Sequence, residues 1–279
     1  MKYFIAFIKQ SFPYALLILL MAFYNRIDSV MLERMLPDGK EQAGIYAQAF
    51  RILEAASMFA YLFSVLLLPM FARMIKQKQN VEGLCKTAFV LIFVPAISLM
   101  SVCLFFNREI MGLMYFEHIE TSSIVLAILM VGFVGICITY IFGTLLTSNG
   151  SLKYLNIMAA CGMVLNIVLN FILIPHYGVI GAAISSMVTQ LATGLCQYII
   201  AFRLFKFNFN LKFTIVTVIF VAVSVAGAYF ATMINCNWWV IICLVLVFCV
   251  VVAVLLRVLD LRLALVMIKD SIAKKKEQQ

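Results

Sequence analysis

Four charged side chains lie inside stretches that are otherwise apolar. Arg26 and Asp28 interrupt FPYALLILLMAFYNRIDSVMLERML, and Arg51 and Glu54 follow in QAFRILEAASM. On a helix Arg26 lies about 21 Å from Phe12, too far to reach the water at that end. Placing a charge inside a bilayer costs at least ~2.5–3.5 kcal/mol, so such a side chain needs a partner or a water-filled cavity. Because planar guanidinium groups suit phosphate, the pattern indicates an anionic ligand.

The short turn between these two stretches predicts how the charges pair. Counted from that turn, Asp28 and Arg51 lie at matching depth on antiparallel helices, as do Arg26 and Glu54. Residues two apart on a helix point about 200° from each other, so both pairs cannot form across one seam. We expect Asp28 to pair with Arg51, while Arg26 projects into a hydrated cavity near Glu54. The alternative is an ion-pair network that only fixes helix register, since desolvation offsets the attraction of a buried pair.

Three asparagines complete the candidate substrate-binding set. Asn25 directly precedes Arg26, and Asn166 and Asn170 lie four residues apart in GMVLNIVLNFILIP. That spacing places both amides on one helix face. Hydrogen bonding between helices is the alternative role for them. The sequence contains no metal-binding, phosphate-loop or catalytic motif, so we expect neither an enzyme nor a cofactor.

Composition identifies an all-α integral membrane protein. The chain has 279 residues, of which 65% are hydrophobic and 12% charged, with a mean hydropathy of +1.09. It contains about eight apolar segments of the ~20 residues that a spanning helix needs. These segments cover 12–36, 43–72, 83–106, 121–147, 152–174, 178–203, 212–234 and 237–257. A transmembrane β-barrel is excluded because its strands would alternate polar and apolar positions.

Basic residues predict the orientation. Most of the 21 Lys and Arg residues fall in connections that alternate to one side of the membrane. The positive-inside rule therefore places both termini in the cytoplasm. We expect the membrane to be the cytoplasmic (inner) membrane. The net charge of +9 does not indicate nucleic-acid binding, because the basic residues follow this anchoring pattern and no soluble basic domain is present.

The connection over residues 107–123 carries a cluster of acidic residues and a histidine. Glu109, Glu117, His118 and Glu120 cluster there, on the side that the orientation places outside. We expect a solvated acidic loop. A cation site and a short interfacial helix are the alternatives.

Three stretches together resemble a known family. They are NRIDSVML, EQAGIYAQAFRILEAASMFAYLFSVLLLPMFARM, and LLTSNGSLKYLNIMAACGMVLNIVLNFILIPHYGVIGAAISSMVTQ. The resemblance is to the polysaccharide and oligosaccharide flippases of the multidrug/oligosaccharidyl-lipid/polysaccharide export superfamily. It implies two lobes of six helices around a cation-lined cavity that opens to each side in turn. It also implies that Arg26, Asp28, Arg51 and Glu54 lie in the cavity wall, where both arginines meet the pyrophosphate of a bacterial polyprenyl-linked oligosaccharide.

The same resemblance implies how this chain is divided. Residues 1–206 correspond to the second lobe, residues 207–259 to two additional C-terminal helices, and residues 260–279 to a basic amphipathic cytoplasmic tail. The first lobe has no counterpart, so we expect a truncated form or a missing lobe supplied by another chain or a second copy. A cation-coupled multidrug exporter of the same superfamily is an alternative function. A non-transporting membrane scaffold of a glycan-assembly complex is another.

Overall fold

The structure, a computed structural model, describes residues 2–208, 210–234, 236–256 and 258. Every regular element in this part of the chain is an α-helix, as expected. The helices are α1 (Lys2–Met35), α2 (Gly39–Lys76), α3 (Glu82–Phe105), α4 (Asn107–Met114), α5 (Ile119–Ser148), α6 (Leu152–Leu204), α7 (Leu211–Ala231) and α8 (Trp238–Leu255). The predicted tail over residues 260–279 lies outside the described residues.

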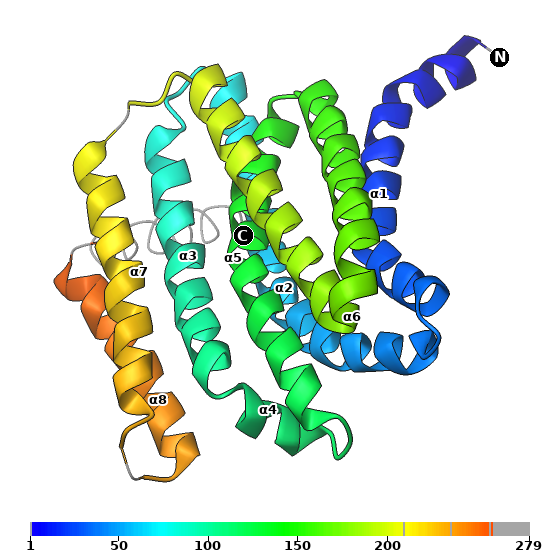
Figure 1. The fold of residues 1–279 in the computed structure, drawn as a ribbon. Helices are drawn as coiled ribbons and strands as arrows, with labels where there is room; N and C mark the ends of the chain where they lie inside the picture. The colour runs from blue at the N-terminus through cyan, green and yellow to red at the C-terminus, as the bar shows by residue number, and fades with distance from the viewer. Residues whose placement is uncertain (1, 209, 235, 257, 259–279) are drawn as a thin grey trace, which may run out of the picture.

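Six of these helices are long and apolar enough to cross a membrane, which confirms the membrane class. A seventh candidate is α1, whose segments Ser11–Phe23 and Arg26–Met35 bend by 42° relative to each other. The 53 residues of α6 would extend ~80 Å as one helix, far beyond a hydrocarbon core of ~30 Å. They instead fold back at Gly178 into two arms that lie side by side (Figure 1). The count of eight spans stays a prediction.

The reversal in α6 depends on a glycine. Gly178 has φ 55° and ψ −133°, a backbone conformation that residues with a Cβ rarely adopt. The side chain of Gln42 on α2 supports the turn, since its Oε1 accepts a hydrogen bond from the backbone N–H of Val179 at 3.3 Å. Sequence analysis ended one apolar segment at residue 174 and began the next at residue 178, and the structure places the reversal at Gly178.

Helix α5 lies in the centre of the bundle and contacts α6, α2, α3 and α4. Small residues allow its backbone to touch that of α6. A Cβ on Gly135 would lie 2.5 Å from the backbone oxygen of Gln190, and one on Gly194 would lie 2.7 Å from the backbone oxygen of Gly135. The α5–α6 interface is therefore fixed by the absence of side chains at these positions.

Helices α7 and α8 form a hairpin that packs on α3, while α1 packs against α6 and α2 (Figure 1). Within the hairpin, a Cβ on Gly227 would lie 2.2 Å from the ring of Phe248, so the two helices are closely fitted. Because the hairpin covers α3, it leaves the exposed surface of α1 and α2 uncovered.

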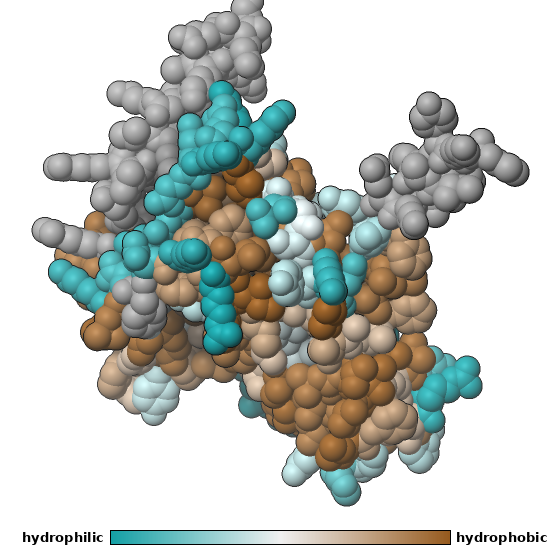
Figure 2. All heavy atoms as spheres, turned by 90° about the horizontal axis from the view of Figure 1, so that it is seen from above, coloured by the Kyte–Doolittle hydropathy of each residue, from teal (hydrophilic) through white to brown (hydrophobic). Residues whose placement is uncertain are grey.

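Basic residues gather at one end of the bundle. Figure 2 looks down on that end and shows hydrophilic side chains grouped there, above flanks that are mainly hydrophobic. Exposed basic residues lie where α2 leads into α3 and where α6 leads into α7; they are Arg73, Lys76, Lys78, Lys86, Arg203, Lys206 and Lys212. Figure 1 shows both connections at the same end, as the predicted orientation requires.

Candidate functional site

Helix α1 presents its two charged residues to different surroundings. Arg26 and Asp28 are two positions apart, so their side chains leave the helix in nearly opposite directions. The Arg26 side chain is 70% exposed. Asp28 is only 1% exposed. One helix therefore contributes to two distinct polar groups.

The first group is an exposed charged surface that we name the α1–α2 charged face: Arg26, Phe50, Arg51 and Glu54. The Nη2 of Arg26 lies 3.1 Å from Oε1 of Glu54. The guanidinium carbon of Arg26 is 6.0 Å from the centre of the Phe50 ring, at the outer limit of a cation–π contact. Arg51 is exposed on the turn of α2 before Glu54, and it makes no ion pair with any residue that the structure describes.

The second group is the buried Asp28 cluster: Asp28, Tyr46, Asn166 and Asn170. The Asp28 carboxylate accepts hydrogen bonds from the Tyr46 hydroxyl and from Nδ2 of Asn170, each at 2.7 Å. Asn170 Nδ2 also donates to Oδ1 of Asn166 at 3.1 Å. All four residues are at most 1% exposed. The cluster joins α1, α2 and the first arm of α6.

Two polar atoms of this cluster remain unsatisfied. Nδ2 of Asn166 and Oδ1 of Asn170 have no hydrogen-bond partner among the described residues. The Asp28 carboxylate likewise has no cationic partner in this part of the chain. Desolvating a carboxylate is costly, so these neutral donors must support whatever charge it carries.

The expected pair of Asp28 with Arg51 is wrong. Arg26 was expected near Glu54 across water, and in the structure the two side chains pair directly. Asp28, however, points towards α6, where Asn170 binds it. The distance of a residue from the turn between α1 and α2 can be counted in the sequence. Whether Asp28 faces α2 or α6, however, depends on how α6 packs against α1.

The structure divides the predicted site residues between these two groups. Asn166 and Asn170 join Asp28, and Arg26 joins Glu54. The side chain of Asn25 lies outside the described residues. Sequence reasoning missed Tyr46 and Phe50, although their spacing of four residues in IYAQAF places both on one helix face. Among the described residues no group of acidic, histidine and cysteine side chains could hold a metal ion.

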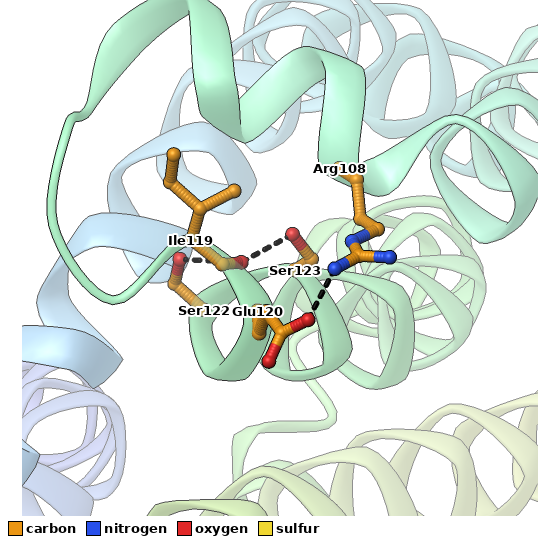
Figure 3. A network of polar contacts seen from close by, with 5 residues as sticks. All are labelled: Arg108, Ile119, Glu120, Ser122 and Ser123. Carbon is orange, nitrogen blue, oxygen red and sulfur yellow. Dashed lines mark hydrogen bonds and ion pairs between the residues drawn. The ribbon is translucent and has the colours of Figure 1, made fainter.

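The acidic connection between α3 and α5 is only partly a loop, because α4 forms within it. Arg108 forms an ion pair with Glu120, and the Ser122 and Ser123 hydroxyls donate to the backbone oxygen of Ile119 (Figure 3). Nε2 of His118 lies 3.5 Å from Oε1 of Glu41 at the start of α2. The expectation of a solvated loop was therefore wrong for Asn107–Met114.

Comparison with known proteins extends the resemblance described above. Residues 1–75 match the model of a family described as polysaccharide biosynthesis protein. That range holds α1 and nearly all of α2, and with them the whole charged face. The chain is 26% identical over 185 residues to the capsular polysaccharide biosynthesis protein CapF of Staphylococcus aureus, covering 64% of this chain and 45% of CapF.

A second relative is an uncharacterized membrane protein of Methanocaldococcus jannaschii, MJ1375. It is 27% identical over 201 residues, which cover 71% of this chain and 46% of MJ1375. The chain thus spans about half the length of the curated relatives it matches. The helical, membrane-spanning fold is that of a multi-pass membrane protein. The matches agree with the resemblance described above, since the chain is similar to polysaccharide biosynthesis proteins.

Proposed function

We propose that this chain forms part of an exporter for polysaccharide precursors. The exporter would carry an oligosaccharide linked to a polyprenyl pyrophosphate from the cytoplasmic to the outer leaflet of a bacterial cytoplasmic membrane. The substrate crosses without any change in its covalent bonds. The observation that carries this proposal is the α1–α2 charged face, because two exposed arginines lie there on helices whose other exposed residues are largely apolar.

The charge balance of this face favours an anion. Arg26 and Arg51 contribute two positive charges, and Glu54 contributes one negative charge. Their exposure would be costly against acyl chains, so the face is expected to border a water-filled cavity. Within such a cavity a guanidinium group binds two phosphate oxygens at once, a geometry that an ammonium group cannot match.

A cavity needs a second wall. Transporters built from repeated halves place their substrate site at the interface between the halves. We propose that the charged face meets another six-helix body, contributed by a further segment of the same protein or by another chain. Rocking of the two bodies would expose the cavity to each side of the membrane in turn.

The buried Asp28 cluster supports a second candidate, a cation-coupled multidrug exporter of the same superfamily. A buried carboxylate without a cationic partner among the described residues is suited to bind a proton or a small cation. Increased drug resistance on expression of the protein, with no effect on glycan export, would favour this candidate. The cluster is also compatible with a cation that drives glycan export.

Replacement of Arg26 and Arg51 tests the proposed function. We expect Arg26→Gln and Arg51→Gln each to lower glycan export about 10- to 100-fold, since a hydrogen bond to a charged group is worth ~1.5–3 kcal/mol. Export would be measured by the appearance of labelled glycan at the cell surface in a strain that depends on this protein.

The matched control is Lys40→Gln, which removes an exposed positive charge from the first turn of α2. Export by this variant should equal that of the wild type. Full export by both arginine variants, at normal amounts of protein in the membrane, would refute the anion-binding role. Loss of the protein from the membrane in both variants would instead favour the scaffold alternative.

A further inference from the structure

An aromatic pair connects the charged face to the buried Asp28 cluster. Tyr46 and Phe50 lie one turn apart on α2, and their rings stack with centroids 5.6 Å apart and planes inclined by 22°. The Tyr46 hydroxyl donates to Asp28 at 2.7 Å. The Phe50 ring lies 6.0 Å from the guanidinium carbon of Arg26. A fully buried carboxylate is thereby joined to an exposed arginine through two rings.

The aromatic pair on α2 links Arg26 to Asp28, although both of these residues belong to α1. Arg26 and Asp28 point in nearly opposite directions from α1. Tyr46 is 1% exposed, so its ring is closely packed and has little freedom to move independently of Phe50. The bond from Tyr46 to a carboxylate is stronger than one to a neutral acceptor, so its strength depends on the charge of Asp28.

We propose that Tyr46 and Phe50 are positioning residues that make the anion affinity of Arg26 depend on the charge of Asp28. This rests on the proposed function, because it takes Arg26 as part of an anion site. While Asp28 is negative, Tyr46 holds Phe50 in place beneath Arg26, which is directed towards Glu54 at 3.1 Å. When the charge of Asp28 is neutralised, the Tyr46 bond weakens, the ring pair relaxes and Arg26 is released to bind pyrophosphate.

Coupling of this kind acts in both directions. Suppose that binding of a cation to Asp28 changes the affinity of Arg26 for an anion by some factor. Binding of the anion to Arg26 must then change the affinity of Asp28 for the cation by the same factor. An anion held by Arg26 therefore favours the neutral form of Asp28, and the cluster and the charged face are occupied together.

The test is a double-mutant cycle on anion binding. The dissociation constant of farnesyl pyrophosphate would be measured by calorimetry on the protein in nanodiscs, with and without Asp28→Asn. We expect Asp28→Asn to tighten binding on the order of fivefold, within the usual range of coupling between sites. In a Tyr46→Phe or a Phe50→Leu background, Asp28→Asn should alter the dissociation constant by less than about twofold.

The matched control is Phe59→Leu, which removes an exposed aromatic ring elsewhere on α2 and should leave the effect of Asp28→Asn intact. If Asp28→Asn changes the dissociation constant equally with and without Tyr46→Phe or Phe50→Leu, the charge acts through space and the proposal is refuted. If Asp28→Asn does not change the dissociation constant in the wild-type background, the proposal is also refuted. Because Tyr46→Phe keeps the ring, thermal unfolding of that variant should remain cooperative.

Failure of the proposed function would give a different result. Farnesyl pyrophosphate binding that is unchanged by Arg26→Gln and Arg51→Gln, or that is absent from the wild type, would refute the anion site itself and the coupling with it. Binding that depends on both arginines but not on the aromatic pair would refute the coupling alone.

Discussion

At the scale of single residues, buried amides determine how Asp28 is accommodated. Asn170 supplies one amide nitrogen that donates both to Asp28 and to Asn166. The three side chains come from α1 and α6, so this bond also holds the two helices together. Since Asp28 is almost inaccessible to water, loss of a donor cannot be compensated by solvent.

We therefore expect Asn170→Leu to lower the free energy of unfolding by ~1–3 kcal/mol, the usual cost of an unsatisfied buried polar group. The measurement is reversible unfolding of the purified protein in detergent. Asn208→Leu is the control, because Asn208 is exposed in the connection between α6 and α7 and its loss should change stability by less than ~0.5 kcal/mol. Equal stability of the two variants would mean that Asp28 does not need the Asn170 amide.

The sequence could predict which residues form this site better than how they pair. Arg26 and Glu54 meet because both lie at the same distance from the turn between α1 and α2, and that distance can be counted. Asp28 binds Asn170, which is 142 positions away in the chain. No local pattern predicts that contact, because it depends on the packing of α6 against α1.

At the scale of elements, glycines decide which helices approach most closely. Gly135 of α5 faces the backbone of α6, and an added methyl group would lie 2.5 Å from the backbone oxygen of Gln190. Gly44 on α2 has nothing within 4 Å of the position where a Cβ would lie. The two glycines therefore differ in packing although both are helical.

Gly135→Ala should destabilise the protein by ~1–3 kcal/mol, because the two helices must move apart. Gly44→Ala should leave stability unchanged or raise it by up to ~1 kcal/mol, since alanine favours the helix. Thermal unfolding of both variants in the same detergent provides the comparison. A Gly135→Ala variant as stable as Gly44→Ala would show that the α5–α6 contact yields easily.

The long apolar helices could be predicted from hydropathy alone, but α4 could not. Its eight residues are too few for a clear periodic pattern. The helix is held by contacts with the bundle, since Met111 is completely buried against it. Tertiary packing therefore determines the structure of a segment that was assigned to solvent because of the acidic cluster in its connection.

At the scale of the whole molecule, the position of the basic residues predicts sidedness. Gln79 lies at the end where exposed lysines and arginines gather, and Glu117 lies in the connection beyond α4 at the opposite end. The positive-inside rule places Gln79 in the cytoplasm and Glu117 outside.

Single cysteines at these two positions would test the orientation in a variant that lacks the eight native cysteines. A membrane-impermeant maleimide added to intact spheroplasts should label Glu117→Cys at once, and Gln79→Cys only after the membrane is permeabilised. Labelling in the reverse order would invert the topology, and labelling of both variants in intact spheroplasts would contradict a single orientation.

The placement of α7 and α8 has a mechanical consequence. Because this hairpin joins the rest of the bundle through α3, it widens the bundle on the flank that faces away from α1 and α2. In the exporter that we propose, any tilt of the bundle would sweep the hairpin through lipid, and the surrounding acyl chains would resist that movement. The thickness and fluidity of the bilayer would then become part of the energy of each transport cycle, so the speed of export would depend on the membrane as well as on the cargo.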